Sequence, residues 1–593
     1  MDRKGIAAVS LAVAVLIAWV IFNNKEMTRV AAVQAKEKAA AAEVAALTKA
    51  AEPIAPDSAT PAPAAAPAVP TVPAAEEKRE ELSGPSVDYT FSNLGGGIAT
   101  ARLKTHEAER GIRMTLNEFG DIPIGAVTDA AGEGTRAPFE SKVEGSSVIY
   151  ERTDARQLQL TKKFTVSGST DLREDYTVTL DVTFTNRGAQ ALTLPGYFVH
   201  TGSSAPVHQK DMATYTGFKS DGGKLIDATY FDSGWFHPAR PVFTVAQPGI
   251  TWAGVVNQYF TTLVTPQYPA PVAGALPVVH GGSAAWAQRF VISDEAWKKA
   301  GRSIEGSAAV RYGLDGALGM PAFTLEPGKS LTQSFRIYAG PREYGRLRLM
   351  PDGQSDIMDF GTFAIVSKTL LNSMNWLHAR FDTFFPGGSY ALAIIVLTLC
   401  IKCLLWPMQN KSTQSMKRMQ LLQPKQAEIR EKYKDDPTRM NTEVMKLYKD
   451  YGVNPMSGCL PMLIQMPIFF GFFGMLGKAV ELRNSKFLWV HDLSQPDTIF
   501  HLPSLGFPVN VLPIVMAATM LWQMSLSPKS GDPMQQRMMM FMPLIFIAFC
   551  YNYASALALY WTVQNLFSVA QLYLTRNQAA PTLQKVPAPP KKK

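Results

Sequence analysis

One lysine, Lys402, lies inside a stretch of sequence that otherwise has the composition of a membrane span. Residues 390–401 before it carry no charge, and residues 403–406 after it are apolar. A charged side chain at the centre of a bilayer costs about 3 kcal/mol on insertion scales, so it usually faces a polar cavity or extends to the membrane surface. Pro407 follows five residues later, about 7 Å along a helix, and a lysine stem can reach an interface at that distance. The stretch therefore leaves a functional charge and a surface anchor as equal alternatives.

Other polar side chains in apolar stretches could converge on Lys402. Thr398 precedes the lysine by four residues, which places both on one face of a helix. Further polar residues in apolar stretches are Gln465, Asn552, Gln564 and Asn565. Together they would form a polar site inside a helical bundle. The alternative for each residue is a single hydrogen bond that joins two helices.

The spacing of cysteines and histidines gives no metal or catalytic motif. Residues 1–399 contain no cysteine, so this part of the chain has no disulfide. Cys400 and Cys403 have C-x-x-C spacing, but a metal or redox site needs polar access and further ligands that this stretch lacks. The histidines before residue 300 are scattered: His106, His200, His208, His237 and His280. We expect no metal, no cofactor and no catalytic residue.

The composition indicates a soluble middle between membrane-embedded ends. The chain has 593 residues, of which 47% are hydrophobic, and its long uncharged apolar runs lie at the N-terminus and after about residue 388. The formal net charge of +9 does not indicate nucleic-acid binding, because lysines and arginines concentrate beside the hydrophobic runs, where they set orientation in a bilayer.

The N-terminal region predicts a membrane anchor and a linker. Residues 6–22 form an apolar run after Arg3 and Lys4, and polar residues follow it in place of a small-residue cleavage site. Residues 1–26 are therefore predicted to be an uncleaved anchor with a cytoplasmic N-terminus. Residues 27–82 are rich in alanine and proline, a composition typical of a flexible linker.

The sequence of residues 83–350 predicts a large antiparallel β-sandwich on the outer side of the cytoplasmic membrane. Apolar and polar residues alternate most clearly between Tyr176 and Thr185, which is the pattern of a half-buried strand. The segment 355–386 that follows has the apolar stripe of an amphipathic helix. We expect this helix to lie along the membrane surface, and packing on the sandwich is the alternative.

Five further spans are predicted after the sandwich, which makes six with the anchor. They lie at about 390–406, 458–480, 509–526, 538–551 and 556–574. Residues 409–454 between the first two are basic and helical, with Asp436 as a cap and Pro437 at the start of a second helix. This hairpin is predicted to be cytoplasmic, the loop 481–507 external, and the basic tail 576–593 cytoplasmic. A docking arm and a solvated helix pair are equal interpretations of the hairpin.

A sequence signature resembles the YidC family of bacterial membrane protein insertases. It reads NPMSGCLPMLIQMPIF over residues 454–469, followed by DPMQQ at 532–536 and Met542-Pro543. The likeness covers about 355–575, and the anchor, linker and sandwich fit the Gram-negative form of this family.

The resemblance implies a five-helix core at 387–575 around a polar groove that is open to the cytoplasm and to lipid. Lys402 occupies the family's charged position, where arginine is usual, and lysine lacks the planar fork for two-point carboxylate binding. The groove residues implied are Lys402, Thr398, Gln465, Gln564 and Asn565. A hydrophobic client segment would slide along Met466, Phe469 and Phe470.

The resemblance also implies the partners and the kind of activity. Nascent inner-membrane proteins would be the clients, and the Sec translocon, the ribosome, the signal-recognition targeting machinery and the lipid bilayer would be partners. The docking residues on the hairpin would be Lys417, Arg418, Lys425 and Arg430. No bond is made or broken in such an activity, so the protein would not be an enzyme.

Two other classes of function remain as alternatives. The resemblance implies that the sandwich is a supersandwich like that of sugar mutarotases, so an anchored periplasmic carbohydrate-binding or epimerase-like protein is the second reading. Fold similarity alone does not carry that function. A small-solute transporter would show paired repeats of broken helices, and the sequence has no such repeat.

Overall fold

The computed structural model describes residues 76–575 except for 110, 210, 212–213, 221–222, 232–239, 241, 269–280, 305–310, 455–459, 502–507, 528–542, 544–545 and 548–549. The predicted anchor, most of the predicted linker, more than half of the predicted span 538–551 and the basic tail lie outside the described residues. The described residues belong to two compact units. One lies within Ala75–Gln414 and Gln465–Ala580, and the other contains Ser415–Ile464.

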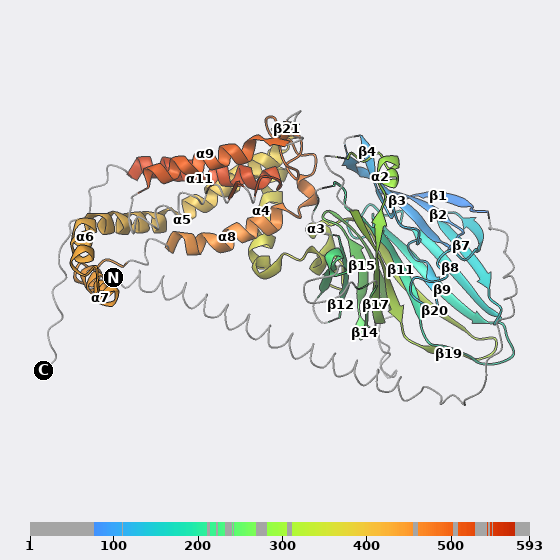
Figure 1. Ribbon diagram of the computed structural model, residues 1–593. Coiled ribbons are helices and arrows are strands. Elements are labelled where there is room, and N and C mark those ends of the chain that lie inside the picture. The colour runs from blue at the N-terminus through green and yellow to red at the C-terminus, as the bar shows by residue number, and fades with distance from the viewer. Residues whose placement is uncertain are drawn as a thin grey trace, which may run out of the picture. The chain divides into compact units, whose positions relative to one another are not determined.

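Antiparallel sheets make up the first unit as far as Pro341 (Figure 1). The largest described sheet has nine strands in the order β13 (Lys224–Asp227), β12 (Tyr215–Lys219), β15 (Trp252–Val256), β16 (Phe260–Gln267), β20 (Ser330–Pro341), β9 (Thr177–Asn186), β8 (Leu158–Val166), β7 (Ser147–Thr153) and β6 (Glu140–Glu144). A five-stranded sheet follows the order β14 (Val242–Ile250), β17 (Gly282–Ile292), β18 (Arg311–Met320), β11 (Tyr197–Ser204) and β5 (Val127–Thr128).

Smaller sheets and short helices complete this β-rich part. A four-stranded sheet runs β1 (Arg79–Ser83), β2 (Val87–Ser92), β3 (Gly97–Glu109) and β4 (Ile112–Leu116), and β10 (Leu192–Leu194) pairs with β19 (Phe323–Leu325). The short helices are η1 (Ala228–Phe231), α2 (Asp294–Lys299) and α3 (Tyr344–Leu347).

The alternation predicted between Tyr176 and Thr185 is confirmed in β9. Val178, Leu180, Val182 and Phe184 are buried on the core side of this strand. β9 pairs with β8 on one edge and with β20 on the other, so it is an interior strand of the nine-stranded sheet. Its side chains thus help to form the apolar core of the β-rich part.

The predicted amphipathic segment 355–386 contains a shorter α-helix, α4 (Ala364–Phe381), after η2 (Gln354–Met358) and η3 (Gly361–Phe363). Asp359 lies between the two short helices with a φ of 43°, and this left-handed backbone interrupts helical geometry. One face of α4 is buried at Leu370, Leu371 and Met374, while Ile365 and Trp376 are exposed.

Besides the hairpin helices given below, four described α-helices follow α4. They are α5 (Ser389–Leu421), α8 (Leu460–Leu476), α9 (Val511–Leu526) and α11 (Ser555–Thr575), and α9 and α11 lie side by side (Figure 1). Among the described residues, α5 is the one helix long and apolar enough to cross a membrane, and Leu463–Leu476 and Val511–Leu526 are shorter apolar stretches. α5 continues through Pro407 to Leu421, beyond residue 406 where the predicted span ends.

Between α8 and α9 the chain contains η5 (Val480–Leu482) and a two-stranded sheet of β21 (Thr498–His501) and β22 (Pro508–Asn510). α8 also approaches α4 closely, at Gly471. A Cβ atom on Gly471 would lie 2.6 Å from Val366 Cγ1, and the Ser367 hydroxyl donates to the Gly471 carbonyl at 3.0 Å. Glycine is therefore required at this crossing.

The second unit contains a helical hairpin of α6 (Gln423–Lys432) and α7 (Pro437–Asp450). Its small core contains Leu422, Tyr448 and Val453. The predicted cap is confirmed, since the Asp436 carboxylate accepts from the backbone N–H of Arg439 at 3.0 Å. A first break that the sequence pattern did not indicate separates α5 from α6 near Leu422.

Candidate functional site

Lys402 is buried on α5, with 4% of its surface exposed. Its Nζ donates to Ser568 Oγ on α11 at 3.2 Å. Ser568 Oγ in turn donates to the carbonyl of Gln564 at 2.9 Å, one turn earlier on the same helix. Among the described residues, no carboxylate forms an ion pair with Lys402. The amine therefore has a neutral partner and keeps its capacity for an anion.

Gln465 on α8 contacts the same face of α11 as Lys402 does. Its contacts lie one and two turns closer to the N-terminus of α11 than Ser568. Its Nε2 donates to Gln564 Oε1 at 3.0 Å and to the Tyr560 hydroxyl at 2.9 Å. Tyr560, Gln564 and Ser568 are spaced by four residues, so they form one polar row on the helix. Side chains from α5, α8 and α11 therefore meet along this row, which we call the Lys402 cluster: Lys402, Gln465, Tyr560, Gln564 and Ser568.

Two of the predicted site residues have other partners. Thr398 is buried on α5, and its hydroxyl donates to the carbonyl of Ile394 in its own helix at 2.7 Å. Asn565 donates through Nδ2 to the carbonyl of Met516 and to Thr519 Oγ1, both at 3.2 Å. Asn565 thus joins α11 to α9 and does not contact Lys402.

Sequence reasoning missed Ser568 and Tyr560. Both are polar residues in an apolar stretch, and both lie four residues from Gln564. A search for polar residues at this spacing would have found them.

The residues predicted to guide hydrophobic client segments lie on α8. Met466 and Phe470 are 39% and 40% exposed. Phe469 instead packs edge-on against Trp561 of α11, with ring centroids 4.8 Å apart. α8 thus presents apolar side chains outward beside Gln465, which points toward α11.

The basic residues predicted for docking lie near or on α6 in the hairpin unit. Lys417, on the last turns of α5, and Arg430 are half-buried, whereas Arg418 and Lys425 are exposed. Lys425 Nζ donates to the Tyr451 hydroxyl and lies 4.6 Å from the centre of that ring. The hairpin therefore carries an exposed basic surface.

His106 and His200 of the β-rich part are shielded from solvent and lie near positive charges. Burial, with the nearby Arg483 and Arg346, lowers the pKa of His106 to about 4. Burial, with the nearby Lys162, lowers the pKa of His200 to about 3. Both rings are therefore neutral at pH 7. No three His, Cys, Asp or Glu side chains in the described part of the chain could hold a metal ion, and His237 and His280 lie outside it.

Two family models match the chain. The YidC periplasmic domain matches residues 80–373, and the 60Kd inner membrane protein matches residues 381–582.

Relatives match over nearly the whole length. A membrane protein insertase YidC from Syntrophus aciditrophicus (strain SB) is 30% identical over 611 residues, which cover 98% of this chain and 100% of the relative. A membrane protein insertase YidC from Oleidesulfovibrio alaskensis is 29% identical and covers 96% of this chain and 98% of its own. A solved structure described as an active YidC insertase with its first transmembrane domain resolved is 17% identical, covers 85% of this chain and 94% of its own, and has a TM-score of 0.34.

Proposed function

Because this chain belongs to the YidC family of inner-membrane insertases, which are not enzymes, we propose that the Lys402 cluster receives the hydrophilic segments of its clients. Insertion moves a polar segment across an apolar layer and leaves a hydrophobic segment in lipid. No covalent bond changes. The protein's part is to lower the cost of removing the polar segment from water, and burial of the client's apolar segment drives its release.

The single observation that carries this proposal is a buried amine that has no carboxylate partner among the described residues. An acidic client segment would supply the missing charge. Attraction between unit charges is stronger away from bulk water than in it, so the cluster would favour acidic segments. The amides of Gln465 and Gln564 would replace part of the hydration of the client's backbone.

We propose six membrane spans: the anchor in residues 1–26, α5, α8, α9, the segment 538–551 and α11. The N- and C-termini and the hairpin 409–454 would then be cytoplasmic, and the sandwich would be periplasmic. Charge supports this orientation, since 409–454 is rich in lysine and arginine, whereas the loop 481–507 has only Arg483 and Lys486.

Helix length supports a membrane that is locally thin at the cluster. α9 has 16 residues between its two caps, which corresponds to about 24 Å of helix. A typical hydrocarbon core is about 30 Å thick, so this helix would need thinning or snorkelling residues. A thinner core would also shorten the path of a polar client segment.

The hairpin is proposed as the docking arm for partners on the cytoplasmic side. Lys417, Arg418, Lys425 and Arg430 would bind acidic surfaces of the ribosome, of the signal-recognition targeting machinery or of the Sec translocon. Nascent inner-membrane proteins would be the clients in each case.

The test compares wild type, Lys402→Ala and Lys402→Arg in reconstituted vesicles. Two clients differ only in whether the translocated tail is acidic or neutral. Lys402→Ala is expected to lower insertion of the acidic client about tenfold relative to the neutral one, because the tail loses its attracting charge. Lys402→Arg keeps the charge and is the matched control. Equal insertion by wild type and Lys402→Ala would leave Lys402 as a surface-anchoring lysine.

Crosslinking locates the path independently. Photoreactive residues at positions 398, 402 and 466 are expected to capture a nascent client in turn as it moves from the cluster toward lipid. Capture from position 466 alone would place the path outside the cluster.

A further inference from the structure

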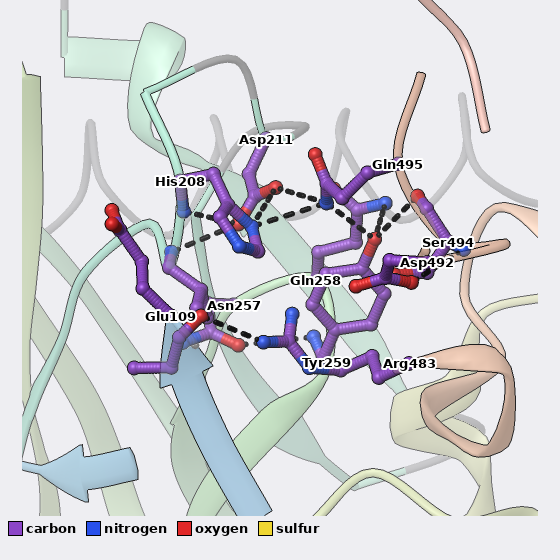
Figure 2. Close-up of polar contacts among 12 residues, drawn as sticks. Glu109, His208, Asp211, Asn257, Gln258, Tyr259, Arg483, Asp492, Ser494 and Gln495 are labelled. Atoms are coloured by element: carbon purple, nitrogen blue, oxygen red, sulfur yellow. Dashed lines mark hydrogen bonds and ion pairs between the residues drawn. The ribbon is translucent and has the colours of Figure 1, made fainter. Parts of the chain in front are cut away.

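The loop between α8 and α9 binds the β-rich part through buried polar side chains (Figure 2). Gln258 Nε2 donates to the carbonyl of Gly477 at 2.7 Å, and the Tyr259 hydroxyl donates to the carbonyl of Ser494 at 3.1 Å. Tyr259 has no exposed surface, and Gln258 has 7%. We call residues 477–497 the docked loop. Its contacts are made by groups that would be costly to leave unpaired.

Arg483 makes the reciprocal contact from the docked loop. Its Nη2 donates to the carbonyls of Glu107 at 2.7 Å and Ala108 at 2.9 Å, both on β3. Its guanidinium also lies over the rings of Tyr259 and Phe260, 4.7 and 5.7 Å from their centres. Carbonyls and aromatic faces of the β-rich part thus surround the guanidinium, while its buried Nη1 has no hydrogen-bond partner among the described residues.

Gln495 anchors the other end of the docked loop. Its Nε2 lies 3.1 Å from His208 Nδ1, 3.3 Å from Asp211 Oδ1 and 3.4 Å from the Tyr259 hydroxyl. Figure 2 marks these contacts with dashed lines. Asp211 is held in turn, because its Oδ2 accepts from the backbone N–H groups of Val207 and His208. The Gln495 side chain therefore lies in a polar pocket made by the β-rich part.

The backbone of the same short segment holds the first turn of α11. The N–H of Ser555 donates to the carbonyl of Gln495 at 2.9 Å, and the N–H of Ala556 donates to the carbonyl of Leu493 at 3.0 Å. The first N–H groups of a helix have no partner within the helix, so these bonds fix where α11 begins and in which direction it runs. Gln495 thus contacts the β-rich part with its side chain and α11 with its backbone.

The docked loop also holds the start of α9. Asp497 Oδ2 accepts from the N–H groups of Val511 at 3.0 Å and Leu512 at 2.6 Å. A carboxylate at a helix N-terminus is favourable by hydrogen bonding and by the helix dipole. α9 is the neighbour to which Asn565 joins α11. The first turns of α11, which carries part of the Lys402 cluster, and of its neighbour α9 are therefore both hydrogen-bonded to the docked loop.

We infer that the β-rich domain positions the client-contacting face of α11 through the docked loop, with Tyr259 and Gln495 as positioning residues. Ser568 is thirteen residues from Ser555, about 20 Å along the helix, so a small tilt at the first turn displaces Ser568 relative to Lys402. The effect on clients rests on the proposed function. The effect on α11 does not.

The test uses the full-length protein in lipid nanodiscs. Tyr259→Phe removes the hydroxyl that donates to Ser494 and keeps the ring under Arg483. Tyr338→Phe is the matched control, since its buried hydroxyl donates to the carbonyl of Pro341 at 2.6 Å, within the β-rich part. Gln495→Met is the second variant, because it removes the side-chain amide and leaves the backbone bond to α11 possible.

The first readout is amide hydrogen exchange at Ser555 and Ala556. Tyr259→Phe and Gln495→Met are expected to raise the exchange rate of both amides about fivefold, and Tyr338→Phe is expected to leave it unchanged. The factor corresponds to the loss of one buried hydrogen bond. The inference would be overturned if the exchange rate were unchanged in both Tyr259→Phe and Gln495→Met, or if it rose equally in Tyr338→Phe.

The second readout separates positioning from general destabilisation. Tyr259→Phe is expected to lower insertion of the acidic client about threefold in the wild-type background and to have no further effect in the Lys402→Ala background. Equal losses in both backgrounds would show a structural effect and overturn the positioning role. Equal insertion by wild type and Lys402→Ala would overturn the proposed function alone, and the exchange result would still decide whether the β-rich domain holds α11.

Discussion

Lys402 is available to an anion because of what lies beside it. Its described partner is a hydroxyl, which can accept from the amine without cancelling its charge. A lysine also differs from an arginine, because its ammonium is a point charge with no fixed fork. Such a group attracts carboxylates in many orientations, which suits clients whose acidic residues stand at different distances from the hydrophobic segment.

A carboxylate built into the cluster should therefore compete with the client. Ser568→Asp places an acid where the Oγ now lies 3.2 Å from Lys402 Nζ. The internal ion pair is expected to lower insertion of an acidic client to the level of Lys402→Ala, about tenfold below wild type. Insertion into reconstituted vesicles measures this.

Ser568→Asn is the control for that substitution, because it has nearly the same volume without the charge. It is expected to retain most of the insertion activity. If Ser568→Asp inserted the acidic client as well as Ser568→Asn does, attraction by Lys402 would not contribute to client capture.

The neighbours of individual polar residues were only partly predictable from the sequence. Adjacent residues on a helix point about 100° apart, so Gln564 and Asn565 cannot easily face the same neighbour. In the structure Gln564 faces Gln465 and Asn565 faces α9. The sequence pattern identifies polar residues in an apolar stretch, but the partner depends on which helix packs against which side.

At the scale of elements, local signals predicted what local forces determine. The alternation in β9 and the cap at Asp436 each depend on residues within a few positions, and both are confirmed. α5 continues beyond the predicted span 390–406 and through Pro407. A proline removes one backbone N–H and strains its helix, yet a helix can continue when the residues on both sides favour it.

The cap at Asp436 supports a prediction about the hairpin. Asp436→Ala removes the acceptor of the Arg439 N–H, which typically costs a helix about 1 kcal/mol. Amide exchange in the first turn of α7 is expected to rise about fivefold, as measured by mass spectrometry of the intact protein.

Asp435→Ala is the matched control, since the neighbouring carboxylate does not cap α7. An equal rise in both variants would mean that the cap does not hold the helix.

At the scale of the molecule, the long-range contacts were beyond the reach of sequence patterns. The loop 481–507 was predicted to be external, with two basic residues and no assigned role. In the structure Arg483 and Gln495 bind side chains and carbonyls more than 200 residues away, with sequence separations of 376 and 287. Periodicity reports which face of an element is buried, but it does not report which distant segment covers that face.

The contacts of the docked loop predict the effect of removing the β-rich domain. Deletion of residues 83–348 should leave insertion of the acidic client measurable but reduced about threefold, because α5, α8 and α11 remain while the start of α11 loses its support. Reconstituted vesicles measure insertion, and helical content measured by circular dichroism checks that the bundle is intact. Complete loss of insertion with an intact bundle would contradict the assignment of activity to the helices.

The same contacts determine the order in which the parts of the molecule can assemble during synthesis. Gln258 precedes Gly477 by 219 residues. At about 5–20 residues per second, synthesis of that interval takes about 10–45 seconds. The β-rich domain is made first, and the docked loop reaches it only after α8 has been made. The start of α11 can therefore be held only after the β-rich domain, the docked loop and α11 have all been made.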